Sequence, residues 1–243
     1  MCTVSFIKTT QGYQITSNRD EHIARSIALP PQAFLENGYS CYYPVDTAAA
    51  GTWFISKSNG DVGVLLNGAF IKHTPKALYK KSRGSILPNI FKEENPLQAL
   101  QEMDLLEMQP CTIILFLQQR LYQCIWDAQQ LHVQLLSTNE SHIWSSITIY
   151  PPKIIAFKQQ EFLKLINSRN ELNTDDILQF HKEMALINVS KKYIELMDEN
   201  MVTVSITTVT VTNHQAVLSY QDCSTNSNYF HSIALHTNAI QDL

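Results

Sequence analysis

The sequence predicts an α+β fold of two mainly antiparallel sheets that pack together, with helices outside. The first observation is the order of elements: strands, a helical crossing, strands, two helices and strands. The second is that neighbouring strands are joined by tight turns, as at Gln118-Gln119. The third is the continuously apolar segment Cys111–Leu117, which is typical of a strand covered on both faces. Such a strand indicates a layered fold.

Length and composition agree with a soluble globular protein. The chain has 243 residues, of which 44% are hydrophobic and 16% charged, and we expect a single domain over residues 1–243. A net charge of −4 argues against a nucleic-acid partner. The longest apolar run is too short for a membrane span. Five cysteines without a CxxC motif favour a reduced chain in the cytoplasm.

The first third of the chain reads as two hairpins around an irregular loop. A strand follows Cys2, turns at Thr10–Gly12 and returns over Tyr13–Ser17. Residues 22–50 contain prolines and an Asn-Gly pair, and we expect an irregular loop there. A second hairpin is predicted from strands at Thr52–Ser56 and Asp61–Leu66.

The remaining elements follow from hydrophobic periodicity and capping signals. Thr174 is a plausible N-cap because acidic residues follow it. The last long strand changes phase near Thr207-Thr208, which predicts a bulge. We expect helices at Ser85–Glu94, Pro96–Asp104, Lys153–Ser168 and from Thr174, and strands at Cys111–Leu117, Arg120–Trp126, Leu131–Leu135, Thr203–Thr212, Ala216–Gln221 and Tyr229–His236.

Cys2 is the strongest candidate for chemistry. Removal of Met1 would leave one residue that carries both a thiol and a free α-amine, and the amine can act as base for the thiol. The first hairpin would return Arg19 and Asp20 to the neighbourhood of Cys2. A cation there favours the thiolate, and a carboxylate can hold the amine. The residues therefore predict a nucleophilic site at the N-terminus.

Structural interpretations of the same residues stay open. A cysteine at position 2 is commonly a small apolar strand residue. Arg19 and Asp20 could form an ion pair that only anchors the hairpin. The basic segment from Lys76 to Arg83 could hold an anionic ligand or simply face solvent. The eight histidines do not have metal-ligand spacing, and we predict neither a metal nor a cofactor.

Several segments together resemble one family. Met1-Cys2 and Asn18-Arg19-Asp20-Glu21 are followed by Gly51-Thr-Trp-Phe54, Gly63-Val-Leu-Leu-Asn67, Ser82-Arg-Gly84 and Val204-Ser-Ile-Thr207. This pattern is similar to the NRDE family, also called the transport and Golgi organisation protein 2 family. That family resembles N-terminal-nucleophile (Ntn) hydrolases of the penicillin V acylase and bile salt hydrolase branch. The resemblance implies a four-layer αββα arrangement.

The resemblance also implies roles for particular residues. Cys2, Arg19, Asp20 and Asn67 would be catalytic, with Asn67 donating its amide to an oxyanion. Asn18, Glu21, Trp53 and Arg83 would bind substrate. The sequence departs from the family at Ser145-Ser146, where relatives place an asparagine.

Two functions follow from the resemblance. The first is hydrolysis of a C–N amide bond in a small or acyl-bearing molecule. The second is non-catalytic handling of lipid, acyl chains or haem, since eukaryotic members are linked to lipid homeostasis and haem trafficking. A mature N-terminal cysteine would favour the first function. The sequence indicates neither the substrate nor the oligomeric state.

Overall fold

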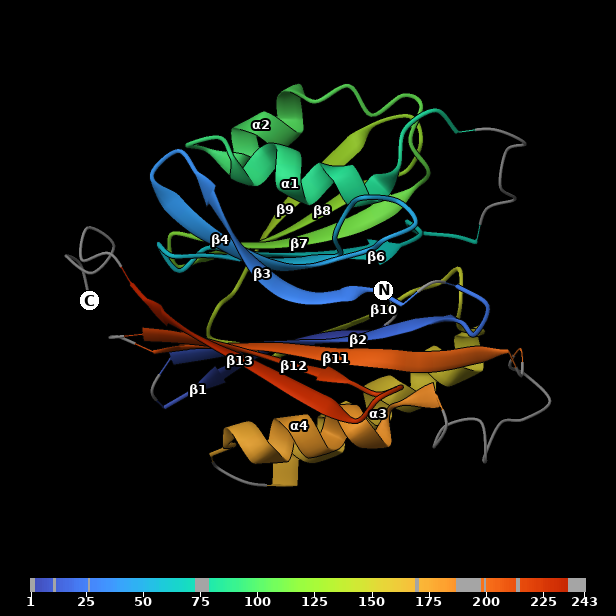
Figure 1. The fold of residues 1–243 in the computed structure, drawn as a ribbon. Helices are drawn as coiled ribbons and strands as arrows, with labels where there is room; N and C mark the ends of the chain where they lie inside the picture. Colours follow the sequence, from blue (N-terminus) through green and yellow to red (C-terminus); the bar gives the residue numbers. More distant parts are fainter. Residues whose placement is uncertain are drawn as a thin grey trace. The chain divides into compact units, whose positions relative to one another are not determined.

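The computed structural model describes residues 3–10, 12–25, 27–72, 79–168, 171–186, 198, 200–212 and 215–235. The chain divides into two compact units (Figure 1). Unit 1 comprises Met1–Arg25 and Asn139–Ser232, and unit 2 comprises Ser26–Thr138 and Ile233–Leu243. Two antiparallel sheets with their helices confirm the predicted α+β class. The single domain over residues 1–243 stays a prediction.

The sheet of unit 1 is built from both ends of the chain. Its order is β10-β1-β2-β11-β12-β13, so β2 lies between β1 and β11 and has hydrogen-bonded partners on both sides. The bounds are β1 (Thr3–Thr9), β2 (Gly12–His22), β10 (His142–Ser145), β11 (Met201–Thr212), β12 (Gln215–Asp222) and β13 (Ser227–Ala234). The strand that carries Arg19 and Asp20 is therefore central in its sheet.

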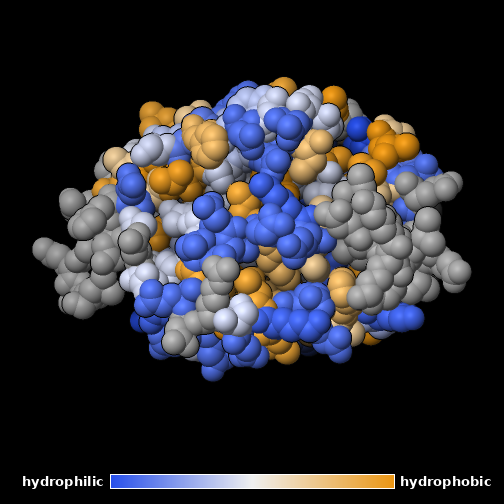
Figure 2. Space-filling view, turned by 90° about the horizontal axis from the view of Figure 1, so that it is seen from below, coloured by the Kyte–Doolittle hydropathy of each residue, from blue (hydrophilic) through white to orange (hydrophobic). Residues whose placement is uncertain are grey.

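Two helices, α3 (Pro152–Ser168) and α4 (Thr174–Glu183), cover one face of this sheet (Figure 1). Their apolar sides meet the sheet in a cluster that includes Ile7, Phe162 and Ile177. The opposite side of this helical layer is largely hydrophilic, with scattered hydrophobic residues (Figure 2). Apolar residues towards the sheet and polar residues on the opposite side are the distribution expected for amphipathic helices that pack on a sheet.

The sheet of unit 2 follows chain order from β3 to β9, so each strand pairs antiparallel with the next strand in the sequence. The connection from β6 to β7, over residues 68–110, is long and contains the helices of the unit. One face is covered by two short helices, whose apolar residues join the core of the unit (Figure 1). The bounds are β3 (Leu29–Glu36), β4 (Tyr39–Val45), β5 (Phe54–Lys57), β6 (Val62–Asn67), β7 (Cys111–Leu117), β8 (Arg120–Trp126), β9 (Leu131–Leu136), η1 (Arg83–Ser85), α1 (Ile86–Phe91) and α2 (Pro96–Glu102).

The prediction of an irregular loop over residues 22–50 is wrong, because this segment contains the hairpin β3–β4. Asn37 and Gly38 form its turn with φ of 48° and 80°, the backbone that a two-residue hairpin turn requires. Pro30 and Pro31 are tolerated because β3 is an edge strand, and the register shifts between Leu29 and Gln32.

Three smaller corrections concern unit 1. The bulge of β11 lies between Thr203 and Ser205, not near Thr207-Thr208. Thr207 and Thr208 are both buried, and burial rather than a bulge explains why the alternation disappears there. α4 is capped by Asn173, which shares a capping box with Asp176, rather than by Thr174. The strand β10 was not predicted, because its four residues are too few to show a period.

Candidate functional site

The site predicted from the sequence begins next to the first described strand. Cys2 itself lies outside the described residues. Thr3, which follows it in the chain, is paired with Asn18 of β2 on one side and with Ser145 of β10 on the other. The register therefore brings the start of β1 to the segment Asn18–Glu21, as the hairpin length predicted.

Asp20 is held by hydroxyl groups from two distant parts of the chain. Its side chain is buried, with 1% of its surface exposed. The Tyr150 hydroxyl donates to Oδ2, and Thr203 Oγ1 donates to Oδ1 over 2.5 Å. The bulge in β11 sets this contact, because it places Thr203 opposite Asp20 and Ser205 opposite Arg19. The carboxylate is thus fixed in one orientation.

Arg19 is also buried, with 4% of its surface exposed. Its guanidinium forms an ion pair with Glu21 at 3.4 Å, and Arg25 contacts the same carboxylate at 3.5 Å. Successive side chains of a strand point to opposite faces, so Arg19 and Asp20 lie on different faces of the sheet. Asp20 lies on the face that carries the helices, since Tyr150 directly precedes α3.

Asn18 forms a buried pair with His181 of α4. His181 Nδ1 and Asn18 Oδ1 are 2.7 Å apart, and Asn18 Nδ2 donates to the His181 carbonyl over 2.9 Å. The other ring nitrogen of His181 contacts Ser5 Oγ at 2.7 Å. Burial, together with the charge of Lys158, lowers the His181 pKa to about 3, so the ring is neutral. These contacts anchor Asn18, and its predicted substrate-binding role stays a prediction.

The remaining predicted site residues lie in unit 2, where the structure brings their segments together. Arg83 Nη1 donates to the Pro110 carbonyl over 3.2 Å, and Gly68, next to Asn67, donates its backbone N–H to the same oxygen over 3.1 Å. The Thr52 backbone N–H donates to the Gly84 carbonyl over 2.9 Å, which places Trp53 beside this group.

Close backbone packing explains two of the glycines in these segments. A Cβ atom on Gly51 would lie 2.5 Å from the carbonyl carbon of Gly84. No side chain fits at that distance, so the backbones of the Gly51–Phe54 and Ser82–Gly84 segments can approach only with glycine there. Trp53, Asn67 and Arg83 are thereby placed on three adjoining segments.

The basic segment before Arg83 is largely neutralised by acidic partners. Lys80 pairs with Glu107 at 2.5 Å, and Lys81 pairs with Asp104 at 2.8 Å. The hydrogen bond and charge of Lys81 lower the pKa of Asp104. Lys76 lies outside the described residues. The described lysines thus form exposed ion pairs on a solvated face, which is the structural interpretation of this segment.

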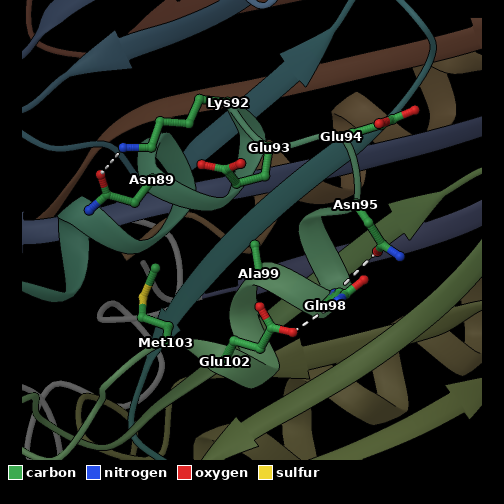
Figure 3. A pocket seen from close by; sticks show the side chains of 9 residues that line it. All are labelled: Asn89, Lys92, Glu93, Glu94, Asn95, Gln98, Ala99, Glu102 and Met103. Atoms are coloured by element: carbon green, nitrogen blue, oxygen red, sulfur yellow. Dashed lines mark hydrogen bonds between the residues drawn. The ribbon is translucent and has the colours of Figure 1, made fainter.

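A surface pocket of about 570 Å³ lies beside α1 and α2 (Figure 3). Two pairs of its polar side chains are hydrogen-bonded: Lys92 donates to Asn89, and Gln98 donates to Glu102. None of the predicted site residues lines it. It lies on the helical layer of unit 2 and is separate from the Asn67–Arg83 group. Among the described residues, no group of acidic, histidine and cysteine side chains could hold a metal ion.

Sequence reasoning missed Tyr150, Lys158, His181 and Thr203, all of which contact the Asn18–Asp20 strand or its neighbour Thr3. Lys158 is recognised in the structure because its charged side chain is buried. No pattern in the sequence of α3 indicates this burial. Ser145 and Ser146 are the residues at which the family resemblance implies an asparagine. Ser145 is paired with Thr3, and Ser146 Oγ lies 2.9 Å from Thr148 Oγ1.

Comparison with solved structures identifies the fold. An N-acylethanolamine-hydrolyzing acid amidase ortholog from Caenorhabditis elegans matches with a TM-score of 0.56 and 12% identity, covering 85% of this chain and 92% of that chain. A cysteine-to-alanine variant of the conjugated bile acid hydrolase from Clostridium perfringens matches with a TM-score of 0.57 and 11% identity, covering 96% and 92%. An arginine-to-leucine variant of the same enzyme matches with a TM-score of 0.54 and 9% identity, with the same coverage.

These identities are low, so the structures show the fold alone, which is of the Ntn-hydrolase type. No curated protein matches the chain. None of the described helices has both the length and the apolar character of a membrane span. The model of one family, Transport and Golgi organisation 2, matches residues 1–229. The chain therefore belongs to the Transport and Golgi organisation 2 family.

Proposed function

We propose that the protein is an N-terminal-cysteine hydrolase that cleaves the C–N amide bond of a small or acyl-bearing substrate. The observation that carries the proposal is the register of Thr3 against Asn18, with Arg19 and Asp20 both buried just beyond. Arg19, a cation, and Asp20, a fixed carboxylate, lie at the end of β2 that pairs with the start of β1. Cys2 directly precedes that start in the chain. The names of the similar structures describe enzymes that act on N-acylethanolamines and conjugated bile acids.

In the proposed reaction, the α-amine of Cys2 takes the thiol proton and the thiolate attacks the substrate carbonyl. The amide C–N bond breaks, the amine product leaves with that proton, and water then hydrolyses the thioester. Arg19 favours the thiolate, and Asp20 orients the α-amine. Asn67 would donate to the oxyanion. Asn18, Glu21, Trp53 and Arg83 would contact substrate. We place the enzyme in the cytoplasm.

The second candidate is a non-catalytic carrier of lipid, acyl chains or haem. It is favoured by Ser145-Ser146, which stand in the block where the family resemblance implies an asparagine; Ser145 is paired with Thr3. A hydroxyl reaches less far than a carboxamide and cannot offer two N–H donors. The two candidates differ in what they require of Cys2: only the hydrolase needs a free α-amine and a reactive thiolate.

Removal of Met1 is the first expected result. The proposed mechanism requires the α-amine on Cys2, and a small second residue permits trimming. The intact mass of protein expressed without an N-terminal tag should correspond to residues 2–243. Retention of Met1 in most molecules would contradict the hydrolase and leave the carrier.

Cys2 should react with iodoacetamide faster than the other cysteines. Burial raises the pKa of Cys41 to about 11 and the pKa of Cys111 and Cys124 to about 12. Cys223 is exposed at the surface, and partial desolvation together with the nearby Asp222 and Asp20 carboxylates raises its pKa to about 11. At pH 7 Cys2 should be alkylated at least about tenfold faster than any of them, because only the thiolate reacts. The rate at each cysteine is followed by mass spectrometry against pH.

Arg19→Ala should slow alkylation of Cys2 about threefold or more, because the loss of a nearby cation raises a thiol pKa. Arg25→Ala is the matched control, since Arg25 contacts the same Glu21 carboxylate but is more exposed. If Cys2 reacts no faster than the other cysteines, or if Arg19→Ala and Arg25→Ala slow its alkylation equally, Cys2 is not an activated nucleophile.

A further inference from the structure

Lys158 is a buried cation in unit 1 for which the proposed reaction has no use. Its side chain is fully buried on α3. Nζ donates to Thr3 Oγ1 over 2.8 Å and to the Met184 carbonyl over 3.1 Å, and it lies 3.9 Å from the centre of the Tyr150 ring. Two of the three N–H donors of the ammonium are used in these hydrogen bonds, and the charge lies over the face of the Tyr150 ring. A buried charge of this kind requires a counter-charge nearby.

The contacts of Lys158 continue to Asp20 as a chain of hydrogen bonds. Thr3 Oγ1 donates to the Tyr150 hydroxyl oxygen over 3.3 Å, and the Tyr150 hydroxyl donates to Asp20 Oδ2. The direction of every bond is fixed by chemistry. An ammonium can only donate and a carboxylate can only accept, so the hydroxyls of Thr3 and Tyr150 each accept from the Lys158 side and donate towards Asp20. Hydrogen bonds aligned in this way polarise one another.

We propose that Lys158 is the buried counter-charge of Asp20 and, through Thr3 and Tyr150, a positioning residue for the site at Cys2. The chain joins α3 to the carboxylate through Thr3, the residue directly after the nucleophile. It holds the start of β1 and the Asp20 carboxylate in one arrangement. The positioning role rests on the proposed hydrolase, whereas the electrostatic link between Lys158 and Asp20 does not.

Other charged or titratable groups in unit 1 also surround Asp20. Arg19 precedes it on β2. The pKa of Cys223 is raised by desolvation and then by the Asp222 and Asp20 carboxylates, and Lys182 of α4 partly opposes this rise. His181 is neutral, and the charge of Lys158 contributes to that. Lys158 reaches Asp20 through a continuous chain of hydrogen bonds by way of Thr3 and Tyr150. Lys158 and Asp20, the two ends of that chain of hydrogen bonds, can therefore be tested separately from the other charged groups around them.

The link is tested by following the Asp20 carboxyl carbon by ¹³C NMR against pH. Lys158→Met keeps an unbranched side chain, shorter by one atom, and removes the charge, and it should raise the Asp20 titration midpoint by about one pH unit. Thr3→Val has the same shape as threonine and breaks the chain while the charge stays, so it should raise the midpoint in the same direction. Lys164→Met, on the exposed side of the same helix, is the matched control and should leave the midpoint unchanged.

Far-ultraviolet circular dichroism first establishes that each variant is folded. If Lys158→Met does not fold, Thr3→Val and Lys158→Arg decide the question, since arginine keeps the charge and should keep the wild-type midpoint. An Asp20 midpoint equal to that of the wild type in folded Lys158→Met or folded Thr3→Val overturns the link, whatever Cys2 does.

The positioning role is tested on the same proteins by alkylation of Cys2 with iodoacetamide. Lys158→Met and Thr3→Val should shift the pH profile of alkylation, whereas Lys164→Met should not. An unchanged profile, together with fast wild-type alkylation, overturns the positioning role and leaves the hydrolase intact. If wild-type Cys2 shows no fast alkylation, the hydrolase and the positioning role both fail. A shifted Asp20 midpoint would then support the electrostatic link alone.

Discussion

Gly12→Ala is expected to prevent unit 1 from forming its sheet. Gly12 starts β2 with φ of 151°, and a Cβ atom there would lie 1.9 Å from the Val211 carbonyl oxygen. That oxygen belongs to the neighbouring strand β11, so the clash is with backbone and no side-chain rotation relieves it. We expect a loss of at least about 3 kcal/mol in the free energy of unfolding, among the largest effects of a single methyl group.

Gly38→Ala is the matched control. Gly38 also has a positive φ, of 80°, but a Cβ atom there would meet nothing within 4 Å. It should lose only about 1 kcal/mol, the cost of left-handed backbone for an alanine. Urea denaturation of both variants measures the difference. Equal losses would contradict the close contact between Gly12 and β11.

Acid should destabilise the protein through His181. Its pKa is about 3 in the folded protein, below the ordinary value of 6.5, because burial and the charge of Lys158 both disfavour the protonated ring. The unfolded chain therefore binds one more proton between those two values. The stabilisation that the neutral His181 ring contributes to the folded protein is complete above about pH 6.5 and is lost as the pH falls towards 3. Between pH 7 and pH 4 the contribution amounts to about 3 kcal/mol.

The measurement is the free energy of unfolding at pH 7 and at pH 4 for the wild type and for His181→Gln. Glutamine stays neutral at both values, so this variant should be less stable at pH 7 but lose about 3 kcal/mol less on acidification. His22→Gln removes an exposed histidine of the same unit and serves as control for loss of an imidazole. If the wild type and His181→Gln lose the same free energy of unfolding between pH 7 and pH 4, the prediction is contradicted. The His181 ring would then stay neutral in the unfolded chain or be protonated in the folded one.

Strands with clear local signals were predictable to the residue. β7 and β8 are bounded by turns and carry continuous or alternating apolar patterns, and both match their predicted ranges. The hairpin β3–β4 was missed because prolines in β3 obscured the strand pattern. Proline excludes only a strand that needs its N–H groups, and an edge strand does not need them on its outer side.

The candidate site was predictable only along β2. Arg19 and Asp20 were identified because they belong to a local motif at the end of a hairpin. The groups that bind Asp20 come from Tyr150 and Thr203, which are separated from it by 130 and 183 residues in the chain. No pattern in a window of sequence reports such a contact, which depends on the pairing of β2 with β11. The bulge that presents Thr203 to Asp20 is likewise set by that pairing.

The pairing of β2 with β11 also determines when the sheet of unit 1 can be completed during synthesis. β11 begins about 180 residues after β2 ends. At a translation rate of about 5–20 residues per second, roughly 10–35 s pass before the ribosome completes the partner strand. The whole of Ser26–Thr138, which contains every strand of the unit 2 sheet, is made within that interval, so that sheet can form while β2 still has an open edge. Sequence-distant pairing of this kind slows folding. We therefore expect the N-terminal hairpin to need protection from aggregation until the last third of the chain has emerged.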